Sequence, residues 1–129
     1  MKVIGGEAVE EVRGGRKLLR IKITAEVSRV EGEHIVDRVV REYTITYGRY
    51  GGDNTAVGFA YARADALESG EAERLAALIK ALTGKEPKMY RMKNGRIMLV
   101  CYGGHLEGFK RYAELADAIE RWLEETSRR

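Results

Sequence analysis

Hydrophobic and polar residues alternate along two stretches in the first half of the chain, and this period of two predicts β-strands. In the first stretch, Lys17 to Val27, apolar residues occupy every odd position from Leu19 onward. In the second, Val39 to Tyr47, one parity holds Val39, Tyr43, Ile45 and Tyr47. We expect the two strands to pair as an antiparallel hairpin through the polar connection 28–33.

The polar positions of this predicted hairpin share its other face. They carry cations and hydroxyl groups: Arg20, Lys22, Thr24, Arg38, Thr44 and Thr46. Such a face is either a solvated sheet surface or a cationic surface that binds a polyanion. The pattern leaves both interpretations open.

A glycine-rich stretch, Gly48 to Asn54, interrupts the strand pattern, and we interpret the next segment, Thr55 to Leu67, as a helix with Asp53 or Asn54 as its N-cap. Small residues recur in it at every fourth position: Ala56, Ala60 and Ala64. Rows of small residues allow a helix to approach a neighbour closely. That neighbour is either another element of the same chain or a second copy of the chain in a homodimer.

The second half of the chain alternates helix and hairpin signals. Apolar residues at spacings of three and four predict an amphipathic helix over Glu71–Thr83, which Gly84 ends. Two short strands, Met89–Lys93 and Arg96–Tyr102, flank Asn94-Gly95, the dipeptide favoured in two-residue type I′ hairpin turns. A broad apolar stripe predicts one final helix over His105–Glu125.

These elements predict an α+β fold with the order ββ-αα-ββ-α, in which an antiparallel sheet is covered on one face by helices. Residues 1–15 hold two Gly-Gly pairs and no sustained periodicity, so we expect an irregular N-terminal segment. Residues 126–129 are expected to form a loose tail. At 129 residues, of which 44% are hydrophobic, the chain fits one domain, residues 1–129.

The composition indicates more about the cellular environment of the protein than about its function. The formal net charge of +3 is too mild to indicate nucleic-acid binding by itself, and 33% charged residues suit a heat-tolerant protein. A single cysteine, Cys101, excludes an internal disulfide framework. Since there is no signal-like segment and no 18-residue apolar run, we expect a cytoplasmic protein that is not in a membrane.

Candidate chemistry is sparse, and we predict no catalytic residue, metal site or cofactor. Cys101 lies near His105, but it shares the parity of apolar strand residues and fits a buried position better than a nucleophilic one. Gly103-Gly104 before a helix is either an anion site or a plain turn. Asp65 and Glu68 are either a metal-binding pair or part of a solvated helix face.

The densest charge lies in the segment Lys85–Arg96, KEPKMYRMKNGR, around the predicted hairpin turn. Its candidate nucleic-acid contacts are Lys88, Arg91, Lys93 and Arg96. A two-stranded ribbon is narrow enough to enter the DNA major groove, and such cations would contact phosphates and release counterions. Tyr90 shares a parity with Lys88 and Met92, so it faces either the ligand or the core. A solvated charged surface is the other interpretation of this hairpin.

Four segments resemble the PaRep-type repeat proteins of crenarchaeal hyperthermophiles: HIVDRVVREYTITYGRYGGDN, FAYARADA, ERLAALIKALTGKEPKMYRMKNGRIMLVC and HLEGFKRYAELADAIERWLEETSRR. The resemblance covers roughly Lys17 to Arg129. That family has no assigned function. What the resemblance implies is an archaeal, hyperthermophilic and cytoplasmic origin and a link to repeated or mobile genetic elements.

A looser, architectural resemblance concerns Leu75 to Leu123, whose order of helix, hairpin and helix is similar to the second half of a LAGLIDADG homing-endonuclease domain. In that family a motif helix with a metal-binding carboxylate precedes the first hairpin. Here only Met1 to Gly15 precedes it. The segment GFAYARADA, 58–66, echoes the motif but follows the first hairpin, so no catalytic role passes to Asp65.

Three hypotheses follow from the sequence. The first is a non-catalytic module that binds nucleic acid, in particular DNA, and contacts phosphates through the strand cations and the basic hairpin. The second is a degenerate or split homing endonuclease, which would require Mg²⁺ and a second chain. The third is a structural domain that oligomerises through the row of alanines without a ligand.

Overall fold

The structure, a computed structural model, describes residues 2–31, 34–51, 54–63, 71–93 and 95–126. Six strands form one sheet: β1 (Lys2–Arg13), β2 (Arg16–Glu31), β3 (His34–Tyr50), β4 (Thr55–Arg63), β5 (Lys88–Arg91) and β6 (Arg96–Cys101). The described helices are α1 (Glu71–Thr83), α2 (Gly103–Phe109) and α3 (Ala113–Glu125). The strand order is β1-β2-β3-β4-β6-β5, and every neighbouring pair is antiparallel.

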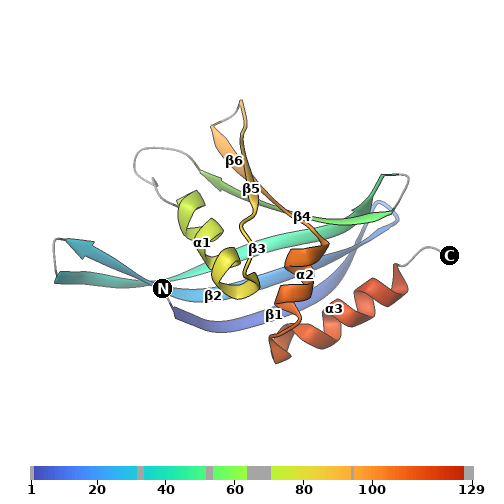
Figure 1. Cartoon of the computed structure of the whole chain (residues 1–129), viewed down its shortest axis with the longest axis horizontal. Helices are drawn as coiled ribbons and strands as arrows, with labels where there is room; N and C mark the ends of the chain where they lie inside the picture. The colour runs from blue at the N-terminus through green and yellow to red at the C-terminus, as the bar shows by residue number, and fades with distance from the viewer. Residues whose placement is uncertain (1, 32–33, 52–53, 64–70, 94, 127–129) are drawn as a thin grey trace.

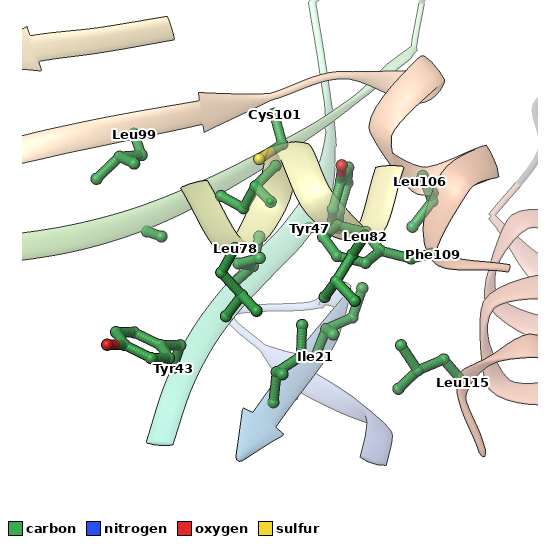
Figure 2. Close-up of a cluster of buried hydrophobic side chains, with 14 of the residues drawn as sticks. Ile21, Tyr43, Tyr47, Leu78, Leu82, Leu99, Cys101, Leu106, Phe109 and Leu115 are labelled. Atoms are coloured by element: carbon green, nitrogen blue, oxygen red, sulfur yellow. The ribbon is translucent and has the colours of Figure 1, made fainter. Parts of the chain in front are cut away.

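The three helices lie on one face of this sheet (Figure 1). α3 packs on β1 and β2, whereas α1 and α2 pack on β4 and β6 and on each other. Leu78 and Leu82 of α1 point into the same cluster as the strand residues Ile21 and Tyr47 (Figure 2). The predicted fold class, an α+β domain with an antiparallel sheet covered on one face by helices, is confirmed. In the part of the chain that the structure describes, no helix has the length and apolar character needed to span a membrane.

Several local predictions are also confirmed. The helix Glu71–Thr83 has the predicted bounds, and Gly84 follows it with a φ of 79°, the left-handed conformation typical of a residue that ends a helix. The first predicted strands pair in the expected way, with Ile21 opposite Ile45 on the buried side and Lys22 opposite Thr44 on the other side. Strong periodicity within one element made these predictions possible.

The segment predicted as a helix over Thr55 to Leu67 is instead the strand β4, as far as the structure describes it. Ala56 and Ala60 belong to a row spaced by four, but with Gly58 between them they also form a row spaced by two, and as strand residues all three face the helices. Phe59 and Tyr61 alternate with them, which is a strand pattern. Ala56 and Ala60 are buried in the chain's own core, while Ala64 lies outside the described residues.

The N-terminal segment predicted to be irregular is the strand β1, which pairs with β2 along nearly its whole length. Its second Gly-Gly pair is a hairpin signal that we missed. Gly14 and Gly15 have φ values of 58° and 76°, and Arg13 pairs directly with Arg16, which defines a two-residue turn of the primed kind. The element order is therefore ββββ-α-ββ-αα.

The C-terminal region differs from the prediction in two ways. The single expected helix over His105–Glu125 is two helices, because the chain turns between Phe109 and Ala113. Thr126, expected in a loose tail, is held: its carbonyl accepts a hydrogen bond from the Asn54 side-chain amide (3.0 Å), and its hydroxyl accepts one from Arg49 Nε (3.1 Å). Asn54 adopts a turn conformation with a φ of 58° instead of capping a helix, and Asp53 lies outside the described residues.

Tyr47 and Gly58, which are direct partners across β3 and β4, set how closely the helices approach the sheet. The Tyr47 ring lies over Gly58, where a Cβ atom would come within 2.6 Å of the ring. The Tyr47 hydroxyl donates a hydrogen bond to the Tyr102 carbonyl (2.9 Å), and its ring meets Trp122 edge to face at 6.2 Å. Only glycine at position 58 leaves room for this arrangement.

Gly58→Ala should therefore destabilise the fold. Overpacking of a filled core costs about 1–3 kcal/mol, and urea unfolding followed by circular dichroism should show a loss in this range. Gly5→Ala is the matched control, because Gly5 is also a strand glycine and nothing lies within 4 Å of a Cβ atom there. Equal stability of the two variants would contradict the role assigned to Gly58.

Candidate nucleic-acid interface

The face of the sheet opposite the three helices carries the candidate interface, and we call it the helix-free face. Because side chains alternate across a strand, the residues on it are those that alternate with the buried ones. On β1, β2 and β3 it is polar and charged, with Glu11, Arg20 and Lys22 among its members. On β4, β6 and β5 it carries mainly apolar and aromatic side chains: Val57, Phe59, Tyr61, Met98 and Tyr90, together with Val100, which is buried.

Acids neutralise the cations of the β1–β3 half. Arg20 forms an ion pair with Glu11, which also binds Arg13 at 2.7 Å, and Lys22 lies 3.8 Å from Glu42. The hydrogen bond from Arg13, reinforced by the charges of Arg13 and Arg20, lowers the pKa of Glu11, so this carboxylate stays ionised at neutral pH. Arg38 pairs with Ser28 along the backbone, and its side chain lies outside what is described. The predicted site residues Arg20 and Lys22 thus belong to a charge-balanced surface.

The β4–β6–β5 half is instead unusually aromatic for an exposed surface. Tyr61 is 53% exposed and Tyr90 is 46% exposed, and both are direct partners of Met98 on the central strand β6. At the same edge Tyr102 is 37% exposed, and the ammonium group of Lys88 lies 5.6 Å from the centre of its ring. Contiguous exposed apolar side chains of this kind mark interaction surfaces on soluble proteins.

A second group of aromatic residues lies where β3 and β4 join. The rings of Tyr50 and Phe59 meet edge to face at 5.6 Å, and the Arg16 guanidinium lies 4.7 Å from the centre of the Tyr50 ring. Leu18 and Tyr50 both lie over Gly48, where an added Cβ atom would come within 3.0 Å of each side chain. Arg16 thus places a positive charge over the aromatic surface.

Between these two groups the helix-free face is hollowed by a cavity of about 520 Å³. β3 and β4 pair from Tyr50 and Thr55 as far as Thr46 and Phe59, and beyond that point β4 pairs only with β6. The cavity lies along this divergence. Its lining includes Thr44, Thr46, Phe59, Tyr61 and, from α1, Leu75.

The basic hairpin formed by β5 and β6 has a longer turn than predicted. The Met92 amide donates to the Arg96 carbonyl (2.8 Å), and the Gly95 amide donates to the Met92 carbonyl (3.3 Å). Three residues therefore lie within the loop, and Gly95 adopts a φ of 82°. A three-residue loop that ends in a left-handed glycine is the next commonest class of hairpin after the two-residue turns. The predicted hairpin is therefore confirmed, but the predicted two-residue type I′ turn is wrong.

The hairpin cations do not all lie on one face. Lys88 pairs with Val100, and Arg96 lies two residues before Met98, so both share the helix-free face with Tyr90. Arg91 pairs with Ile97, which packs against the core, and therefore lies on the opposite face. Lys93 lies in the turn and is exposed. No ion pair joins Arg91 or Lys93 to another of the described residues.

Of the other candidate chemical groups, His105 serves the fold. His105 is buried, and its Nδ1 accepts a hydrogen bond from the Tyr102 amide (3.0 Å). Its Nε2 lies 3.1 Å from the Glu86 carbonyl oxygen. Since a carbonyl oxygen only accepts, Nε2 carries the proton and donates it. Gly104 lies against the Lys85 side chain, whose ammonium nitrogen would be only 2.5 Å from a Cβ atom at position 104. Asp65 and Glu68 lie outside the described residues, and among the described ones no three His, Cys, Asp or Glu side chains are grouped so that they can hold a metal ion.

Comparison with protein-family models, with curated proteins and with solved structures finds no match for this chain. The resemblances to PaRep-type proteins and to a LAGLIDADG half-domain therefore stay predictions. The residues 58–63 that echo the nuclease motif helix lie in the strand β4.

Sequence reasoning missed the part of this interface that β4 contributes. Phe59 and Tyr61 were assigned to a helix, so they were not placed on a sheet face. The signal available was their alternation with Gly58 and Ala60, which indicates a strand. Their position beside Met98 and Tyr90 depends on the pairing of β4 with β6, which cannot be predicted from a local sequence pattern.

Cys101 should be chemically inert in the folded protein. It is fully buried, and burial raises the pKa of its thiol to about 12, so almost no thiolate forms near neutral pH. We expect iodoacetamide at pH 8 to leave the native protein unmodified in mass spectra and to alkylate Cys101 fully in urea. Rapid alkylation of the native protein would contradict this assignment and would favour a reactive cysteine.

Proposed function

We propose that this chain is a non-catalytic nucleic-acid-binding module whose binding surface is the β4–β6–β5 half of the helix-free face. The observation that carries the proposal is the combination, on this half, of exposed aromatic rings with cations beside them. Tyr61 and Tyr90 supply the rings, and Lys88 and Arg96 supply the charge. Proteins that bind nucleic acid commonly combine cations for the phosphates with aromatic surfaces for the bases.

The proposal moves the binding surface away from part of the sequence-based site. Arg20 and Lys22 are paired with acids, so they add little net attraction for a polyanion. Arg91 faces the other side of the sheet. Phosphate contacts are assigned to Lys88 and Arg96 because they share the helix-free face with Tyr90, and to Lys93 at the tip of the hairpin.

The hairpin does not act as a free ribbon in this proposal. β6 pairs with β5 on one edge and, along its whole length, with β4 on the other. A B-DNA major groove about 12 Å wide admits a helix or a two-stranded ribbon. Only the turn around Lys93 and Gly95 extends past the paired strands, so deep insertion of the hairpin is not part of the mechanism.

The remaining hypotheses gain less support. The row of alanines proposed for a homodimer is buried at Ala56 and Ala60, so self-association would need another surface. The nuclease alternative, with its Mg²⁺ and second chain, has no observation in its favour among the described residues. A link to a mobile genetic element rests on the resemblance alone.

Replacing Lys88 and Arg96 together by glutamine should weaken nucleic-acid binding at least tenfold, because two phosphate contacts are lost. Fluorescence anisotropy with a labelled oligonucleotide at about 50 mM salt measures this change. The dependence of binding on salt should also become shallower by about 1.4–1.8 units of slope, since two phosphate contacts are lost and each contributes roughly 0.7–0.9.

The control is the double variant Arg91→Gln, Arg111→Gln, which removes the same number of charges from outside the proposed surface. Both variants lower the formal net charge from +3 to +1. The control should bind nearly as tightly as the wild type. Equal losses in the two variants would contradict a localised surface and would indicate that net charge alone attracts the ligand.

A further inference from the structure

We infer that the ligand is a single strand of nucleic acid, and that two of its bases stack on Tyr61 and Tyr90. This inference rests on the proposed function and deepens it, because it specifies the form of the ligand and the groups that hold its bases. It follows from three features of the helix-free face: a row of rings, the width of the face, and the cavity beside it.

The row of rings runs across three strands. Tyr61 of β4 and Tyr90 of β5 are each a direct partner of Met98 on β6, so the two rings flank one thioether side chain. Since neighbouring strands are about 4.8 Å apart, the two tyrosine positions are separated by roughly 10 Å. Both residues are about half exposed, so part of each side chain is accessible to a base.

The width of the face favours a single strand over a duplex. At the level of Tyr61 and Tyr90 the face consists of β4, β6 and β5, because β3 has already diverged from β4. Three strands form a wider surface than the two-stranded ribbon that the DNA major groove admits. In a duplex the bases are stacked on one another, so the exposed tyrosine rings would meet backbone and base edges but no base face. In a single strand the bases are free to turn onto the rings.

The cavity beside Tyr61 supplies a place for a third base. Its volume of about 520 Å³ lies within the range of small-molecule sites, and Tyr61 and Phe59 form its aromatic side. Thr44 and Thr46 line it with hydroxyl groups that can both donate and accept hydrogen bonds. A base turned out of the row beyond Tyr61 would lie in this cavity, whose lining also includes Arg13 and Glu42.

The cations lie beside this row and not within it. Lys88 lies two residues before Tyr90 on β5, and Arg96 lies two residues before Met98 on β6. A strand whose bases stack on the tyrosines therefore passes positive charge on both sides of the row. This placement separates phosphate contacts from base contacts, as expected for binding with little sequence preference.

The test compares oligonucleotides of one mixed sequence as single-stranded DNA, single-stranded RNA and duplex DNA, all with the full chain and at one salt concentration. At least one single strand should bind tenfold or more tightly than the duplex. Tyr61→Ala combined with Tyr90→Ala should weaken single-strand binding at least tenfold, whereas Tyr61→Phe combined with Tyr90→Phe should retain it, because stacking needs the ring and not the hydroxyl group. Thermal unfolding of each variant verifies that it folds.

The outcomes separate this inference from the proposed function. If duplex DNA binds as tightly as both single strands, or if the alanine variant binds single strands like the wild type, the inference is overturned while nucleic-acid binding stands. If no oligonucleotide binds even at low salt, the proposed function fails and the inference fails with it. Preference for RNA or for DNA identifies the source of the strand and supports the inference in either case.

Discussion

Tyr47 is where the layers of this domain meet, and its position determines which residues reach each face of the sheet. Its ring covers Gly58 on the neighbouring strand, contacts Trp122 of α3 and donates its hydroxyl hydrogen to the chain at the start of α2. Trp122 in turn donates from Nε1 to the Lys17 carbonyl on β2 (3.1 Å). One buried tyrosine thereby joins three strands and two helices. A shift of one residue in the register of β3 or β4 would turn every side chain of that strand to the other face, and this packing would be lost.

The same constraint exposes the surface that we associate with function. All described helices pack on the Tyr47 side, so none of them covers the other face of the sheet. The two halves of this uncovered face differ in their side chains. On β1 and β2 the side chains are charged and paired, as with Arg20 and Glu11, which suits contact with water. On β4, β5 and β6 the side chains are aromatic and apolar, as with Tyr61 and Tyr90, which leaves apolar surface that water does not favour. A ligand with flat apolar groups and negative charge fits the second half.

The sequence predicts the parts of this fold in which one element carries its own pattern. The α1 helix and the β2–β3 pair were predicted because their periodicities are strong and single. β4 was predicted as a helix because its small residues fit both a helical spacing of four, as Ala56 and Ala60 do, and a strand spacing of two, as Ala56, Gly58 and Ala60 do. The reason for small residues in a strand here is the Tyr47 ring, which lies on the neighbouring strand. β1 was missed because its partner holds it in place: its own sequence is rich in glycine and weakly patterned, and its pairing with β2 supplies the order.

The candidate interface was predicted only in part for a related reason. The basic hairpin is a local feature, so its cations were recognised, but their division between two faces depends on the register with β6. The aromatic partners come from β4, some thirty residues earlier in the chain, and reach the hairpin through a strand order that skips β5. Ion pairs such as Lys22 with Glu42 likewise depend on strand pairing, so the neutralisation of the predicted cationic face was not visible in the sequence.

The most direct test of this account is to map ligand binding on the protein by NMR, with backbone amide resonances followed during titration with a short single-stranded oligonucleotide. The account predicts that shifts concentrate on β4, β5 and β6, around Tyr61, Tyr90 and Met98, and are small on the exposed sides of α1 and α3. Shifts that concentrate on the helices or on β1, with the β4–β6–β5 half unchanged, would contradict it.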